Sequence, residues 1–102
     1  MDIMVDELKE RLEVKEQVFL CDVREPYEHE EFNIGGELIP LGSLPANISK
    51  MPSDKDVEIV MYCRSGGRSG MAKQFLEQHG YTNVRNLVGG MLEWQRRFAS
   101  SK

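Results

Sequence analysis

The stretch that decides the fold runs from Val57 to Gly70 and reads VEIVMYCRSGGRSG. It opens with a mostly apolar run that stops at Cys63, and a short run of this kind predicts a buried strand. A loop rich in glycine and arginine follows, and a segment with helical spacing begins at Ser69. A strand that ends in a cysteine, a tight turn and a helix that starts at once together predict an anion-binding cradle with a nucleophile at its base.

Strands and helices are predicted to alternate along the rest of the chain. Apolar spacing and turn residues predict the following elements: a short strand or lead-in at Ile3–Val5, a helix over Val5–Glu13, a strand over Val18–Cys21, a short helix from Pro26 to about Phe32, a strand at Leu38-Ile39, one or two short helices within Leu41–Pro52, a helix over Ser69–His79, a strand centred on Val84 and a last helix carrying Met91, Trp94 and Phe98. This alternation is typical of an α/β fold with a mostly parallel sheet and helices on both faces. In such sheets ligands bind beyond the carboxyl ends of the strands, which is where Cys63 is expected.

Length and composition indicate a single small domain. The chain has 102 residues, and we expect residues 1–102 to fold around one core. A net charge of −4 argues against a nucleic-acid binder, and the apolar runs are too short to span a membrane. The first residues lack a basic region followed by an apolar core, so we expect no signal peptide and a cytoplasmic location. No apolar stripe is left beyond those the core needs, so we expect a monomer.

The two cysteines are predicted to have different roles. Cys21 and Cys63 are too few for a disulfide scaffold and are not spaced as zinc ligands. Cys21 lies inside an apolar run and is predicted to be a small buried hydrophobe. Cys63 is predicted to be a reactive thiol. Neither His29 nor His79 is placed to pair with it, so we do not expect a cysteine-protease-like dyad.

The loop after Cys63 offers the chemistry that a reactive thiol needs. A thiol is a good nucleophile only as the thiolate, and nearby arginines or a helix N-terminus lower its pKa from roughly 8.5. Glycines allow the loop to turn its backbone N–H groups inward as a nest for an anion. The residues predicted to bind the substrate are Arg64, Ser65, Gly66, Gly67, Arg68 and Ser69. Such a loop would bind a tetrahedral oxyanion, and would equally stabilise negative charge on a sulfur attached to Cys63.

Each of these features also has a purely structural explanation. A cysteine at the end of a buried strand is more often inert than nucleophilic, and paired glycines are often only a turn. Arg64 could simply face solvent. The combination of strand, cysteine, glycine pair, arginine, serine and helix within Val57–Gly70 is what favours a functional role for Cys63 and Arg68.

Five segments of the chain carry a family resemblance. They are Asp22–Glu28 (DVREPYE), Phe32–Gly36 (FNIGG), Ile39–Leu41 (IPL), Cys63–Ser69 (CRSGGRS) and Gly89–Trp94 (GGMLEW). In this order they closely resemble the rhodanese family of small single-domain sulfurtransferases. The resemblance implies a three-layer α/β/α fold with a five-stranded parallel sheet in the order 3-2-4-5-1. Many members have histidine where this chain has Asn33, but an asparagine can hydrogen-bond locally, so we expect the turn to survive.

The resemblance also implies a reaction. Cys63 would accept a sulfane sulfur from a small anionic donor such as thiosulfate and become a persulfide, without a cofactor or a metal. A cyanide, thiol or protein acceptor would then remove the sulfur by double displacement. One alternative is a rhodanese-type sulfur-carrier or interaction module with little small-molecule turnover. Another is a phosphatase or arsenate reductase, although related phosphatases use Cys-x5-Arg whereas Cys63 to Arg68 is Cys-x4-Arg.

Asp22 and Arg24 are predicted to support the site. Asp22 ends the strand that the implied strand order places beside the Cys63 strand. It either pairs with a loop arginine, as the resemblance suggests, or pairs only with Arg24. The acidic run Glu28–Glu31 is predicted to be a solvated helix face.

Overall fold

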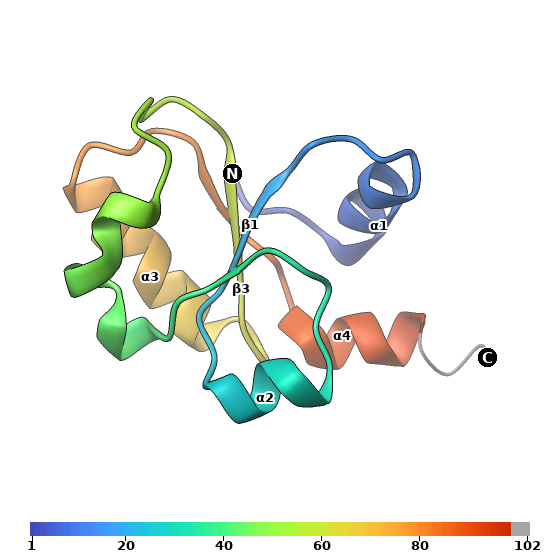
Figure 1. Cartoon of the computed structure of the whole chain (residues 1–102). Helices are drawn as coiled ribbons and strands as arrows, with labels where there is room; N and C mark the ends of the chain where they lie inside the picture. Colours follow the sequence, from blue (N-terminus) through green and yellow to red (C-terminus); the bar gives the residue numbers. More distant parts are fainter. Residues whose placement is uncertain (99–102) are drawn as a thin grey trace.

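The computed structural model describes residues 1–98 and shows a parallel sheet between layers of helices (Figure 1). The elements follow in this order: α1 (Val5–Glu13), β1 (Phe19–Asp22), α2 (Pro26–Glu31), β2 (Glu37–Leu38), the 3-10 helices η1 (Leu41–Ser43) and η2 (Pro45–Lys50), β3 (Ile59–Tyr62), α3 (Gly67–Gln78), β4 (Val84–Asn86) and α4 (Gly90–Arg97). The predicted alternation of strands and helices is confirmed. Residues 99–102 of the predicted domain lie outside the described residues. Within residues 1–98 no helix is long and apolar enough to cross a membrane.

Within the described chain the sheet has four strands in the order β2-β1-β3-β4, with every neighbouring pair parallel. The expected count of five strands is wrong, because the first expected strand is only an isolated parallel bridge between Ile3 and Leu87. The N–H of Ile3 donates to the carbonyl of Asn86 at 3.0 Å. Met4 is already the N-cap of α1, and Val5 is its first helical residue. The extended segment at the edge of β4 is therefore too short to form a strand, although it lies where the fifth strand was expected.

Side chains along the strands alternate between two apolar clusters, one on each face of the sheet. In β3, Val60 and Tyr62 pack with residues of α1 and α4, whereas Ile59 and Met61 pack with residues of α3 and of the η1–η2 segment. All four residues of β3 are buried, as expected for a central parallel strand that is covered on both faces. The prediction of helices on both faces is confirmed.

The helix after β3 begins earlier than predicted. It starts at Gly67 rather than at Ser69, and Gly66 is its N-cap. Gly66 has a φ of +109°, a left-handed conformation that glycine adopts without steric cost. Because the chain turns sharply at Gly66, Arg68 lies in the first turn of α3 rather than in the loop. This short connection brings the N-terminus of α3 up to the end of β3, where Cys63 lies.

Candidate active site

Cys63 follows β3 directly and is almost completely buried, with 1% of its surface exposed. Three groups donate hydrogen bonds to its Sγ: the backbone N–H of Gly66 at 3.1 Å, the backbone N–H of Ser69 at 3.4 Å and the hydroxyl of Ser69 at 3.4 Å. Gly66 is the N-cap of α3 and Ser69 lies in its first turn. The sulfur therefore occupies the end of a helix whose N–H groups have no partner within the helix itself.

This environment changes the acidity of the thiol. Burial raises the pKa of Cys63, but hydrogen bonds from Ser69, Gly66 and Ser65 lower it by more, so the pKa lies below its ordinary value. At Cys21, burial raises the pKa to about 12. Cys63 is therefore the thiol that ionises more readily, and Cys21 is the buried, neutral side chain that the sequence predicts.

The first turn of α4 holds the backbone of the loop Cys63–Gly66, called the cysteine loop below. The N–H of Met91 donates to the carbonyl of Cys63, and the N–H of Leu92 donates to the carbonyl of Arg64, each at 2.9 Å. Gly90 has a φ of +56°, and a Cβ there would overlap the carbonyl oxygen of Cys63. The second glycine of the closing GGMLEW segment is therefore required by the close approach of the cysteine loop.

Arg68 forms an ion pair with a residue of α2, the helix whose acidic face was predicted to be solvated. Its Nη1 and Nη2 donate to the two carboxylate oxygens of Glu28 on α2, at 2.8 and 3.0 Å. The hydrogen bond from Arg68 lowers the pKa of Glu28 to about 2, and the same bond raises the pKa of Arg68. The prediction of a solvated acidic face is therefore wrong at Glu28, because the first turn of α2 faces the first turn of α3.

Arg64 is the loop arginine whose charge is not neutralised. It is exposed, and its side chain has no hydrogen bond or ion pair within residues 1–98. It borders a small pocket of about 190 Å³ between α2 and α4. The other lining residues are Arg24, Glu28, Glu31, Phe32, Met91, Leu92 and Gln95. Arg64 thus presents an unpaired guanidinium immediately after Cys63.

Ser65 and Gly67, the two other predicted loop residues, are both exposed. The backbone N–H of Ser65 contributes to lowering the Cys63 pKa. A Cβ on Gly67 would meet no atom within 4 Å. Of the predicted glycine pair, only Gly66 adopts the left-handed conformation that the turn needs.

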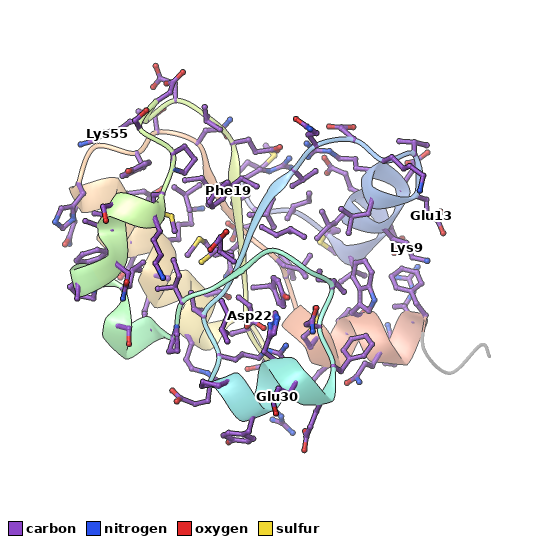
Figure 2. The ribbon with its side chains drawn as sticks, viewed as in Figure 1. Lys9, Glu13, Phe19, Asp22, Glu30 and Lys55 are labelled. Atoms are coloured by element: carbon purple, nitrogen blue, oxygen red, sulfur yellow. The ribbon has the colours of Figure 1, made fainter. Side chains whose placement is uncertain are left out.

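Asp22 pairs with Arg24 and not with a loop arginine. Fully buried at the end of β1 next to α2 (Figure 2), it accepts hydrogen bonds from Arg24 Nε at 2.9 Å and Nη2 at 2.8 Å. Asp22 Oδ2 also lies 2.8 Å from Nδ1 of His29, and Arg24 donates to the carbonyl of Phe32 at 2.6 Å. The alternative that Asp22 pairs only with Arg24 is closer to the structure, although it omits His29. The cluster fixes both ends of α2, and hence the position of Glu28.

The turn after α2 forms despite the substitution at Asn33. Oδ1 of Asn33 accepts a hydrogen bond from the N–H of Gly35 at 2.8 Å. The hydroxyl of Tyr62, at the end of β3, donates to the carbonyl of Gly35 at 2.8 Å. The expected local hydrogen bond of Asn33 is thus confirmed, and the turn is anchored to β3.

Two residues whose side chains contact the predicted loop residues, Glu28 and Asn86, were not predicted as part of the site. Glu28 is the third residue of α2 and forms a capping box with Glu25, a pattern that would have placed its carboxylate at the helix N-terminus. Asn86 ends β4 and contacts both Ser69 and Gly66. A polar residue at the carboxyl end of the strand next to Cys63 was the available signal for it.

Comparison with known proteins identifies the family. Residues 4–97 match the rhodanese-like domain family. A sulfurtransferase of Allochromatium vinosum is 42% identical over 96 residues, covering 93% of this chain and 88% of that protein. The putative sulfur carrier protein YrkF of Bacillus subtilis is 32% identical over 94 residues, covering 91% of this chain but 50% of that protein. The structure of the human single-domain sulfurtransferase TSTD1 superimposes with a TM-score of 0.81 at 27% identity, covering 94% of this chain and 96% of that one. The chain therefore belongs to the rhodanese-like domain family.

Proposed function

We propose that this protein is a sulfurtransferase that carries a sulfane sulfur as a persulfide on Cys63. The observation that carries the proposal is the position of Cys63 Sγ, which is buried and receives hydrogen bonds from Gly66 and Ser69 at the N-terminus of α3. These donors favour a negative charge on sulfur, both on the thiolate and on the persulfide. The similarity to a protein named sulfurtransferase supports the same conclusion.

The reaction is a double displacement at sulfur. The Cys63 thiolate attacks the sulfane sulfur of thiosulfate, a new S–S bond forms, and the S–S bond of thiosulfate breaks. Sulfite leaves with the bonding electron pair. Cyanide or a thiolate then attacks the outer sulfur of the persulfide, and Cys63 departs again as the thiolate. Since Cys63 enters and leaves as an anion, the cycle needs no general base and no external oxidant.

The two arginines of the site have different parts in this proposal. Arg64 has an exposed, unpaired guanidinium, and it attracts the anionic donor toward the cysteine loop. Arg68 is tied to Glu28 by two hydrogen bonds, so much of its charge is already neutralised. Its part is to fix the first turn of α3, and thereby the donors to sulfur.

A sulfur-carrier module is the second candidate, because one relative, matched over half of its own length, is named a putative sulfur carrier protein. Both candidates form the persulfide, but they differ in how it is discharged. A carrier would keep the persulfide in the presence of cyanide and release it quickly to a protein thiol. A phosphatase is disfavoured by the Cys-x4-Arg spacing, which makes the loop shorter than the Cys-x5-Arg loop expected for a phosphate.

The proposal is tested by steady-state formation of thiocyanate from thiosulfate and cyanide. The wild-type protein and Cys21→Ser should both turn over, whereas Cys63→Ser should show none while remaining folded. Turnover retained by Cys63→Ser would overturn the proposal. A persulfide that forms but does not react with cyanide would favour the carrier, and hydrolysis of an aryl phosphate without sulfur transfer would favour a phosphatase.

A further inference from the structure

Asn86 makes an unexpected pair of contacts with the residues that surround the sulfur. Its side-chain Nδ2 donates to the carbonyl of Gly66 at 3.1 Å, and its Oδ1 accepts from the hydroxyl of Ser69 at 2.5 Å. Gly66 and Ser69 are also the residues whose N–H groups donate to Cys63 Sγ. One amide on β4 therefore holds two of the residues that supply hydrogen bonds to the sulfur.

The orientation of the Asn86 amide follows from its partners. If the amide were rotated by 180°, Oδ1 would face the carbonyl oxygen of Gly66, and two acceptors would meet without a proton between them. The observed orientation satisfies Gly66 and leaves Oδ1 as the acceptor for Ser69. The two partners therefore fix the orientation of the amide, with Nδ2 toward Gly66 and Oδ1 toward Ser69.

Ser69 has a single hydroxyl proton to share between two acceptors. Its Oγ lies 2.5 Å from Oδ1 of Asn86 but 3.4 Å from Sγ of Cys63. The shorter contact is the stronger one, so Oδ1 of Asn86 competes with the sulfur for this proton. When the hydroxyl donates to Asn86, the sulfur keeps the backbone N–H groups of Gly66 and Ser69, which are effective only if the backbone is held in place.

Asn86 is itself fixed on the sheet. It lies beside Met61 in the register of β3 and β4, and its backbone N–H donates to Asp2 at 3.1 Å. Its carbonyl accepts from Ile3 at 3.0 Å. The sheet thus gives the amide a rigid base from which to hold the loop.

We propose that Asn86 is a positioning residue for the sulfur cradle. By holding the carbonyl of Gly66 and the hydroxyl of Ser69, it aims the N–H groups of these two residues at Cys63 Sγ. This inference rests on the proposed role of Cys63 as the reacting thiolate, and it adds a residue on a different strand to that site.

The test measures the rate of Cys63 alkylation by iodoacetamide as a function of pH. Asn86→Leu removes both hydrogen bonds at similar volume, and Asn86→Asp keeps the acceptor for Ser69 but loses the donor to Gly66. Asn83→Leu is the matched control, since Asn83 is exposed and its side chain makes no hydrogen bond within residues 1–98. Each variant is compared with and without Ser69→Ala, because a hydroxyl released from Asn86 is free to turn toward the sulfur.

We expect the midpoint of the alkylation profile to rise by roughly one pH unit in Asn86→Leu on the Ser69→Ala background. Asn86→Asp should raise it further, because it also places a negative charge near the sulfur, and Asn83→Leu should leave it unchanged. If the Asn86 variants are folded and keep the parental midpoint, Asn86 only stabilises the fold and the proposal is overturned. If Asn86→Leu does not fold, a parental midpoint in the isosteric Asn86→Asp overturns the proposal in the same way. Alkylation needs no sulfur donor, so the result stands whether or not the protein transfers sulfur.

Discussion

Glu28 on α2 accepts two hydrogen bonds from the guanidinium of Arg68 on α3, at 2.8 and 3.0 Å. The pair links the helix that follows β1 to the helix that follows β3, beside the cysteine loop. It also leaves Arg64 as the loop arginine whose side chain has no hydrogen bond or ion pair within residues 1–98. An acidic residue outside the loop therefore decides which of the two arginines keeps an unpaired charge.

Replacing Glu28 tests how far it masks the charge of Arg68. Glu28→Gln should lower the KM for thiosulfate by about 2- to 5-fold at low ionic strength, because a second guanidinium is then available to the anion. Glu30→Gln is the matched control, because Glu30 is exposed on the same helix. Initial rates against thiosulfate concentration measure the effect. An unchanged or higher KM in Glu28→Gln would mean that Arg68 acts only when Glu28 aligns it.

Arg64 should influence donor capture more than chemistry. Arg64→Ala should raise the KM for thiosulfate by about 3- to 10-fold and change kcat by less than about 2-fold, since the lost attraction acts on an exposed approach path. The difference should shrink as salt is added. Arg64→Lys, which keeps the charge, should recover most of the affinity. A fall in kcat at unchanged KM would instead place Arg64 at the reacting atoms.

The glycines of the site differ in what they tolerate. Gly90→Ala should destabilise the protein by about 2 kcal/mol or more, because the added Cβ meets the carbonyls of Cys63 and Arg64 at a φ of +56°. Gly67→Ala should be neutral or slightly stabilising, because its Cβ would enter open space at the start of α3. Urea unfolding of both variants makes the comparison. Equal stability of the two would contradict the packing of α4 against the cysteine loop.

Glu58 provides a test of stability against pH. It accepts hydrogen bonds from Arg11 at 2.9 Å and from Arg85 at 2.8 Å, and the bond from Arg11 is the main cause that lowers its pKa from 4.5 to about 2. Because the folded-state pKa is depressed, the stabilisation is complete above pH 4.5 and is lost as pH falls toward 2. Glu58→Gln should therefore cost about 1–2 kcal/mol of unfolding free energy at pH 7 and progressively less below pH 4.5.

The control for Glu58 is another paired glutamate whose own side chain is exposed. Glu13 pairs with Lys9 at 2.9 Å, and 63% of its side chain is exposed. Glu13→Gln should change the unfolding free energy by less than about 0.5 kcal/mol at any pH. A cost for Glu58→Gln that stays constant from pH 7 to pH 2 would show that packing, rather than ionisation, holds this network together.

The order of elements was predictable because each has a local signature. The Val5–Glu13 helix shows apolar residues at helical spacing, and its predicted bounds equal those of α1. The strand before Cys63 shows a buried run with a turn after it. The prediction of a strand at Ile3 was wrong because a strand needs several consecutive residues in extended conformation, and the apolar pattern does not give that number. The helix that begins at Val5 leaves only Ile3 to pair with Leu87.

The residues that reach the site from other elements were less predictable than the cysteine loop itself. Gly66 and Ser69 lie within a few residues of Cys63 in the sequence, so a predicted strand, turn and helix already place them near the sulfur. Glu28 and Asn86 reach the site through the packing of α2 and β4, from positions 40 and 17 residues away from their partners. Contacts of that kind depend on where helices are placed against the sheet, which apolar spacing alone does not specify.

The most direct test of the central claim is the intact mass of the purified protein before and after incubation with thiosulfate, alongside Cys63→Ser and Cys21→Ser. We expect the wild-type protein and Cys21→Ser to gain the mass of one sulfur atom and to lose it on addition of cyanide or a thiol. Cys63→Ser should gain nothing. A gain that persists in Cys63→Ser, or no gain in the folded wild-type protein with thiosulfate or any other sulfane donor, would contradict a persulfide on Cys63.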